Sequence, residues 1–213
     1  MFRASKPSSD IDHHRPILEV LSALPTPGVA ADVGSGFGRI TNHLRSLGWQ
    51  VEGCELDQQL ALRAGVDHAD VREWSPPNPV NLVTCIELIE HLTLEDQMPL
   101  LRSLRSWLMT DGLLVISSPQ RHSPVAFWDR MEARFKRVPY DWLDPTHISV
   151  LPRRRLEKFL TAAGFEIQDR RGITFAPDYL AVRFNACNRL RIASSAGVMS
   201  RFGWDLIYTC RAV

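Results

Sequence analysis

The sequence predicts an α/β fold in which helices cover both faces of a doubly wound, mostly parallel sheet of seven strands. Short apolar segments alternate with helical patterns along the chain, as they do in successive βαβ units. A glycine-rich turn follows the first apolar segment. A chain of 213 residues with 45% hydrophobic content can bury the core of one domain, so we expect residues 1–213 to form a single domain.

The first half of the chain carries the clearest alternation of elements. Residues 80–86 are apolar almost throughout, which is typical of a central parallel strand buried on both faces. Gly48 follows a helical pattern directly and is a natural C-terminal cap. The pattern predicts helices at 15–24, 37–47 and 58–64, and strands at 29–33, 50–54, 66–71 and 80–86.

The second half continues the pattern after one interruption. Thr93 with Asp96 three residues later resembles a capping box, and Leu101, Leu104 and Leu108 give its helix one apolar face. A turn at Asp111 and Gly112 leads to a fifth strand. From 120 to 149 the alternation stops, so we expect a small lid or insertion there. The remaining expected elements are strands at 113–117, 165–169 and 205–213, and helices at 124–135, 153–163 and 179–192.

The composition argues against several classes of protein. No apolar stretch reaches the ~20 residues of a membrane span, and the N-terminus lacks the apolar segment of a signal peptide. The four cysteines lie far apart without a CxxC pair, so neither a disulfide framework nor a cysteine-based zinc site is indicated. We therefore expect a cytoplasmic protein that has no membrane partner.

The stretch VAADVGSGFG indicates the kind of ligand. Gly34, Gly36 and Gly38 allow a sharp turn and a close approach of the backbone to a ligand. Their GxGxG spacing is neither the GxGxxG of dinucleotide-binding turns nor the GxxxxGK[ST] of a phosphate-binding loop. Asp32 adds a carboxylate that favours an ammonium or a sulfonium over a pyrophosphate. Glu55, at the end of the second strand, is placed to accept hydrogen bonds from both hydroxyls of a ribose.

These features together resemble the class I S-adenosylmethionine (SAM)-dependent methyltransferases. The resemblance covers roughly residues 29–164 and is specific in DVGSGFG, in the acidic end of the second strand and in the order of elements. It implies a Rossmann-like fold with SAM as the cofactor. By this resemblance the three glycines lie under the methionine part of SAM, Asp32 reaches its ammonium group, and Ile86 and Glu87 close the methionine side. Glu55 binds the ribose. Leu56 packs on the adenine ring, and Asp70 and Val71 contact the adenine edge.

The acceptor side offers two candidate catalytic bases. Methyl transfer needs the acceptor held in line with the sulfonium, and a hydroxyl acceptor must also lose its proton. His91 follows the expected cofactor wall, and His147 follows the interruption in the pattern. Imidazoles ordinarily titrate near neutral pH, so either side chain suits this role. A hydrogen-bonded histidine that holds a loop in place is the alternative for each.

The stretch CIELIEHL also permits a metal site. Glu87, Glu90, His91 and the later His147 resemble the Glu-x-x-Glu-His…His ligand set of the small-RNA 3′-terminal 2′-O-methyltransferases. In those enzymes a divalent ion such as Mg2+ or Mn2+ lowers the pKa of the hydroxyl that is methylated. The same segment is also similar to that of O-methyltransferases of the ubiquinone-biosynthesis type, in which it often binds no metal. We favour the reading without a metal.

The sequence thus favours a SAM-dependent methyltransferase that O-methylates a small molecule. Residues 1–120 hold 9 Lys and Arg against 15 Asp and Glu, whereas residues 121–213 hold 16 against 9. The basic second half slightly favours an anionic acceptor. Two alternatives stay open: a metal-dependent RNA 3′-terminal 2′-O-methyltransferase, with nucleic acid as the less favoured partner, and a SAM-binding subunit without catalytic activity.

Overall fold

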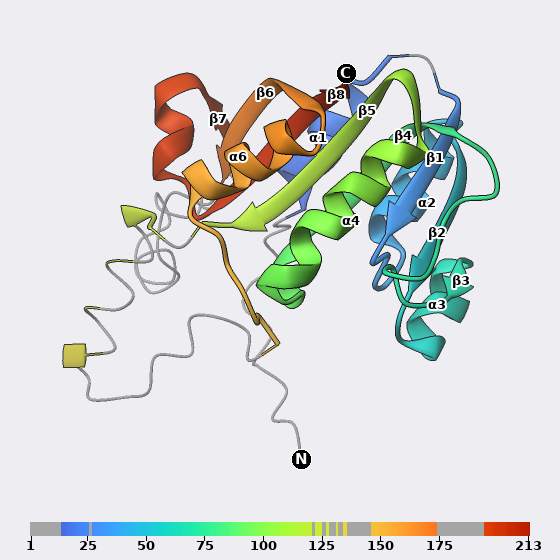
Figure 1. Ribbon diagram of the computed structural model, residues 1–213, viewed down its shortest axis with the longest axis horizontal. Helices are drawn as coiled ribbons and strands as arrows, with labels where there is room; N and C mark the ends of the chain where they lie inside the picture. Colours follow the sequence, from blue (N-terminus) through green and yellow to red (C-terminus); the bar gives the residue numbers. More distant parts are fainter. Residues whose placement is uncertain are drawn as a thin grey trace.

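The computed structural model describes residues 14–25, 27–120, 122–124, 127, 131, 134–135, 146–173 and 194–213. Within them the chain forms one mixed sheet of eight strands in the order β3-β2-β1-β4-β5-β8-β6-β7 (Figure 1). The strands are β1 (Val29–Val33), β2 (Gln50–Glu55), β3 (Asp67–His68), β4 (Val80–Ile86), β5 (Leu108–Pro119), β6 (Phe165–Ile173), β7 (Ser194–Ala196) and β8 (Asp205–Ala212).

The strands from β3 to β5 are parallel, and β8 runs antiparallel between β5 and β6. The helices are α1 (Arg15–Ser22), α2 (Arg39–Ser46), α3 (Gln58–Ala64), α4 (Leu94–Trp107) and α6 (Arg153–Ala162), with 3-10 helices η1 (Ile89–His91) and η2 (Gly197–Phe202). None of the helices in the described segments is long and apolar enough to cross a membrane.

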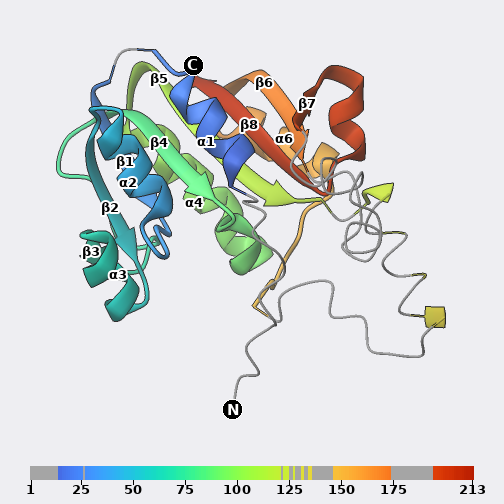
Figure 2. The ribbon, with the colours of Figure 1, turned by 180° about the vertical axis from the view of Figure 1, so that it is seen from behind.

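Helices cover both faces of the sheet (Figures 1 and 2), and an apolar core lies on each face. The helices α4 and α6 pack on one face, where Leu101 and Leu160 are fully buried with Val83 of β4. The helices α1 and α2 cover the other face, where Leu44 packs with Leu82. Neighbouring residues of β4 therefore enter different cores, which is the reason for its continuous apolar sequence. The predicted α/β class and the helices on both faces are confirmed.

The strand count of seven is wrong, because β7 adds an eighth strand. Its three residues, Ser194 to Ala196, pair antiparallel with β6 and have no apolar alternation that sequence reasoning could detect. The third strand is shorter than predicted, with only Asp67 and His68 paired to β2. The sixth strand is longer than predicted and extends to Ile173 because β8 pairs along it.

The turn expected at Asp111 and Gly112 is a bulge inside β5. Leu108 pairs with Val80, and pairing resumes with Leu113 opposite Leu82. Asp111 adopts the left-handed conformation at φ 60°, so its turn chemistry is used within the strand. Leu108 consequently belongs to β5 and not to the end of the preceding helix, although it is buried as expected.

Two predicted features fall largely outside the described residues. They are the lid at 120–149, with its helix at 124–135, and the helix at 179–192. Both stay predictions. The end of the first feature is described, and there residues 146–150 run alongside η1, where the backbone N–H groups of Ile148 and Ser149 both donate to the carbonyl oxygen of Glu90.

Candidate functional site

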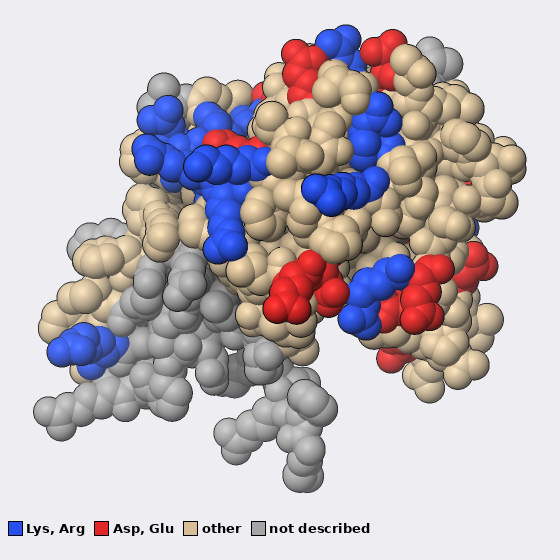
Figure 3. Space-filling model, in the orientation of Figure 1, with Lys and Arg blue, Asp and Glu red and all other residues tan. Residues whose placement is uncertain are grey.

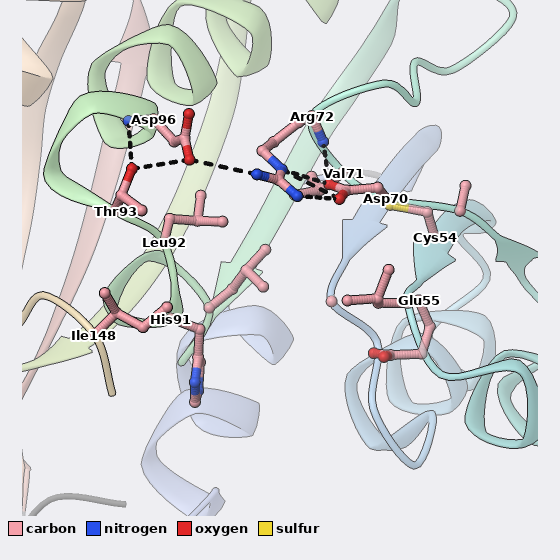
Figure 4. A pocket seen from close by; sticks show the side chains of 14 residues that line it. Cys54, Glu55, Asp70, Val71, Arg72, His91, Leu92, Thr93, Asp96 and Ile148 are labelled. Atoms are coloured by element: carbon pink, nitrogen blue, oxygen red, sulfur yellow. Dashed lines mark hydrogen bonds and ion pairs between the residues drawn. The ribbon is translucent and has the colours of Figure 1, made fainter. Parts of the chain in front are cut away.

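A pocket of about 220 Å³ opens where the parallel strands β1, β2 and β4 end (Figure 4). This edge of an α/β sheet is where such folds bind their ligands. The residues that line the pocket come from the β1 turn, the end of β2, the segment after β3, the η1 region, the first turn of α4 and the segment before α6: Gly34, Cys54, Glu55, Leu56, Ala69, Asp70, Val71, Arg72, Leu88, His91, Leu92, Thr93, Asp96 and Ile148.

The three glycines of the β1 turn have left-handed backbones but different surroundings. A Cβ at Gly34 would lie 2.8 Å from Leu88 Cδ1, and one at Gly38 would lie 2.8 Å from the Cα of Ala64. A Cβ at Gly36 would meet no atom within 4 Å. The turn therefore packs closely at both ends and leaves open space at its centre, where a ligand can approach the backbone.

Glu55 fixes this turn from the end of β2. Its Oε2 accepts a hydrogen bond from the backbone N–H of Gly36 at 2.8 Å, and its Oε1 accepts one from the N–H of Asp57 at 3.0 Å. Each carboxylate oxygen has a further lone pair available. The carboxylate lies along the pocket wall, so it can accept hydrogen bonds from a ligand while it holds the turn (Figure 4).

Asp32 lies beneath the turn and is not a pocket-lining residue. Its side chain is 1% exposed and accepts hydrogen bonds from Thr41 Oγ1 at 2.5 Å and Thr84 Oγ1 at 2.6 Å. Burial raises the pKa of this carboxyl, and the two hydroxyl donors oppose that shift. The sequence reasoning missed both threonines, although Thr84 is the one polar side chain in the buried middle of β4. The predicted contact of Asp32 with the ammonium of SAM stays a prediction.

Asp70 and Val71 lie at the opposite end of the pocket from η1. The carboxylate of Asp70 accepts from Arg72 Nε and, at 2.5 Å, from Arg72 Nη2, and this ion pair lowers the pKa of Asp70. Arg72 Nη1 also reaches Asp96 Oδ2 at 3.4 Å, so the arginine bridges the pocket wall to the first turn of α4 (Figure 4). The sequence reasoning missed Arg72. Leu56 lines the pocket nearby and is 67% exposed.

The segment after β4 is strained and polar. Glu87 has φ 49° despite its side chain, and its Oε1 accepts a hydrogen bond from Ser117 Oγ at 2.5 Å. Burial raises the pKa of Glu87. Neither Ile86 nor Glu87 is a lining residue of the described pocket, so their predicted contact with the methionine part of SAM stays a prediction. Ser117 was missed, although its place at the end of a buried strand marks it as a candidate.

Glu90 is fully buried beside Glu87. Neither carboxylate oxygen has a partner with hydrogen-bond geometry among the described residues. Burial, together with the nearby Glu87 carboxylate, raises the pKa of Glu90 to about 10, so this carboxyl is protonated at neutral pH in the absence of a cation.

His91 and His147 lie side by side, as the metal-site alternative required. Their ring centroids are 4.8 Å apart at an angle of 70°. His91 Nδ1 lies 3.1 Å from the carbonyl oxygen of Thr146. One nitrogen or oxygen atom from each of Glu90, His91 and His147 falls within 4.8 Å of the others. Three of the four ligands of the metal-site alternative are therefore brought together, whereas the carboxylate of Glu87 accepts a hydrogen bond from Ser117.

Comparison with known proteins assigns this fold and pocket to a family. A family model described as "Methyltransferase domain" matches residues 11–169. The ubiquinone biosynthesis O-methyltransferase of Aeromonas salmonicida is 25% identical over 161 residues, which cover 68% of this chain and 66% of that protein.

Two solved structures show the same fold at low sequence identity. Magnesium protoporphyrin IX methyltransferase from Synechocystis, solved with bound S-adenosylhomocysteine, has a TM-score of 0.68 at 15% identity and covers 100% of this chain and 90% of its own. The small RNA methyltransferase HEN1 has a TM-score of 0.70 at 13% identity and covers 100% of this chain but 27% of its own. With the family match over most of its length, this chain belongs to the SAM-dependent methyltransferases.

Proposed function

We propose that this enzyme transfers the methyl group of SAM to a hydroxyl group of a small-molecule acceptor. The observation that carries the proposal is the pair His91 and His147, which stands beside the cofactor pocket and includes one of its lining residues. A carbonyl oxygen can only accept, so the hydrogen bond to Thr146 places a proton on His91 Nδ1, and the tautomer with that proton has its lone pair on Nε2. Such a nitrogen is suited to remove the proton of a hydroxyl.

The residues around the pocket fit SAM. The open space at Gly36 accepts the methionine part, and Gly34 and Gly38 hold the turn in place beneath it. Glu55 accepts from the ribose hydroxyls, Leu56 packs on the adenine ring, and the ionised Asp70 accepts from the adenine amino group beside Val71. In this proposal Ile86 and Glu87 close the methionine side, and Asp32 acts on the ammonium through the turn above it.

The bound cofactor supplies an electrophilic methyl group, and this chain positions the acceptor. Alignment of the acceptor oxygen with the sulfonium accounts for much of the rate, and proton removal by a positioned base adds typically ~10²–10⁴-fold. The name of the Aeromonas relative supports oxygen as the acceptor atom. We further propose that residues 1–213 act as one domain and that 120–149 cover the acceptor.

An anionic acceptor suits the charge of the nearby surface. Figure 3 shows Lys and Arg side chains gathered on the α6 side of the molecule. The first turns of α6 supply Arg153, Arg154, Arg155 and Lys158. The segment that carries His147 leads directly into this helix, so a negative charge on the acceptor is attracted toward the site.

A second candidate is methyl transfer assisted by a metal ion. The cluster of Glu90, His91 and His147, with both Glu90 oxygens buried and without hydrogen-bond partners among the described residues, favours it. Carboxylate and imidazole ligands suit Mn2+ and, with more oxygen ligands, Mg2+. Glu87 would be a fourth ligand after leaving Ser117. This chemistry is that of the RNA 3′-terminal 2′-O-methyltransferase alternative, but the likeness to HEN1 extends to the fold alone.

A panel assay with methyl-labelled SAM tests the proposal. We expect transfer to a phenol, catechol or sugar hydroxyl and little effect of EDTA. We also expect a loss of ~10²-fold or more in kcat for His91→Asn or His147→Asn, with unchanged SAM affinity for His147→Asn, whose side chain does not line the pocket. Loss of activity with EDTA and recovery with Mn2+ or Mg2+ would establish the metal-assisted candidate instead. SAM binding without transfer to any member of a broad panel would contradict the proposal and favour a non-catalytic subunit.

A further inference from the structure

Gln97 is a fully buried polar residue in α4 whose amide reaches two separate segments. Its Nε2 donates to the carbonyl oxygen of Ile89 at 2.9 Å and to that of Ser149 at 2.8 Å. Ile89 belongs to η1, which carries His91, and Ser149 lies two residues after His147. One side chain therefore joins the two segments that present the histidine pair.

Backbone hydrogen bonds complete the connection between these segments. The N–H groups of Ile148 and Ser149 donate to the carbonyl oxygen of Glu90, each at 2.9 Å. Both bonds lie in the same short stretch that Gln97 contacts. They set the register of the segments, whereas Gln97 anchors both of them to a long helix packed in the core. Without that anchor the two segments keep their mutual bonds but are no longer held by one common side chain, so the distance between the rings that they present is less restrained.

We propose that Gln97 is a positioning residue that fixes the distance between His91 and His147. It touches neither SAM nor the acceptor and acts through the two backbone segments. The inference rests on the proposed function, in which these histidines serve the acceptor. A displacement of about 1 Å in such a site can cost ~10²-fold in rate, so a change in the distance between the rings affects turnover directly.

The decisive measurement does not require turnover. Gln97→Met keeps the volume of the side chain and removes both amide donors. In the SAM-loaded protein with labelled histidines, we expect the nuclear Overhauser effect between the two imidazole rings to fall at least threefold. The ring centroids are 4.8 Å apart, and a further separation of about 1 Å gives roughly this loss, because the effect falls with the sixth power of distance.

Arg105→Met is the matched control. Arg105 lies on the same helix and also donates to backbone carbonyls, those of Gly164 at 3.2 Å and of Val213 at 2.7 Å, but at the far end of α4. Its loss removes a comparable connection without touching η1 or residues 146–150. We expect this variant to keep the ring-to-ring signal and kcat within about twofold of the parent.

The outcomes separate the positioning role from the proposed function. If Gln97→Met retains the ring-to-ring signal, the positioning role is overturned. If the signal falls while His91→Asn and His147→Asn leave panel turnover unchanged, positioning holds and the proposed function fails. If both hold, kcat falls at least tenfold in Gln97→Met, while SAM affinity stays within about twofold. Should Gln97→Met not melt cooperatively, Gln97→Asn, which places the amide one methylene short of both carbonyls, is measured with the same criteria.

Discussion

At the scale of single residues, Glu90 has an unusual electrostatic state with a measurable consequence. Its carboxyl is buried next to a second carboxyl, so the charged form is disfavoured twice, by desolvation and by repulsion. The folded-state pKa of about 10 lies far above the ordinary value of 4.5. The contribution of such a group to the free energy of unfolding is fully present below pH 4.5 and is lost as the pH rises toward about 10.

We predict that Glu90→Gln becomes more stable relative to the parent protein as the pH rises. Glutamine resembles the protonated carboxyl in shape and carries no proton to lose, so the variant lacks the pH-dependent cost. Urea unfolding with EDTA present should show a difference in the free energy of unfolding that is larger at pH 9 than at pH 6 by more than about 1 kcal/mol. The exposed Glu73→Gln should show no such trend. An equal difference at both pH values for Glu90→Gln would contradict a raised pKa.

Sequence reasoning at this scale found residues that belong to a recognisable motif and missed residues that are marked only by their partners. Asp70 and Val71 were predicted at the pocket and do line it. The burial of Asp32 by Thr41 and Thr84 could not be read from the sequence, because Thr84 is 52 positions away. The role of Gln97 could not be predicted either, because in the helix pattern it is an ordinary polar position and its partner Ser149 lies 52 positions away.

At the scale of elements, the β1 turn divides its glycines between packing and ligand approach. Gly38 precedes α2 and contacts Ala64 in α3, so it sets how closely these helices pack. Gly36 faces the open centre of the turn. The GxGxG spacing predicted the turn but not this division, which depends on where α3 returns in space.

We predict that Gly36→Ala mainly weakens cofactor binding, whereas Gly38→Ala mainly lowers stability. Both changes place a Cβ on a left-handed backbone at a cost of about 1 kcal/mol. Only Gly38→Ala also forces a Cβ against Ala64, so it should lower the free energy of unfolding by a further ~1–3 kcal/mol in urea titrations. Gly36→Ala should weaken SAM binding at least tenfold by calorimetry, because its methyl enters the space proposed for the cofactor. Equal stability losses and unchanged SAM affinity in both variants would contradict the division.

Element boundaries followed the sequence where packing and caps agree. The helix α4 begins after Thr93, whose Oγ1 accepts from the N–H of Asp96 as the capping-box pattern predicted. The predicted end of this helix was wrong, because Leu108 fits the apolar face of a helix and a buried strand equally well. Pairing with β4 decides between the two, and such non-local pairing leaves no mark in a single sequence.

At the scale of the whole molecule, the cofactor pocket draws on elements from the first 150 residues, and β8 and β6 complete the far side of the sheet. The pocket joins the β1 turn, β2, the segment after β3, and η1, and Arg72 bridges to α4 across it. A ligand in this pocket therefore contacts segments that otherwise touch mainly through the sheet. Binding should consequently stabilise the global fold.

We predict that SAM raises the melting temperature of the full chain by mass action. At a free concentration of one hundred times Kd, a ligand specific for the folded state adds about 2.7 kcal/mol. For a chain of this size that corresponds to roughly 5–10 °C. S-adenosylhomocysteine, which lacks only the methyl group, should act similarly, whereas adenosine and methionine supplied separately should not.

Glu55→Gln, which removes the charge from the carboxylate that holds Gly36, should need at least tenfold more SAM for the same shift in melting temperature. Because Glu73→Gln alters a carboxylate outside the pocket, it should respond to SAM as the parent does; an equal loss in both variants would point to net charge and not to the Glu55 contact.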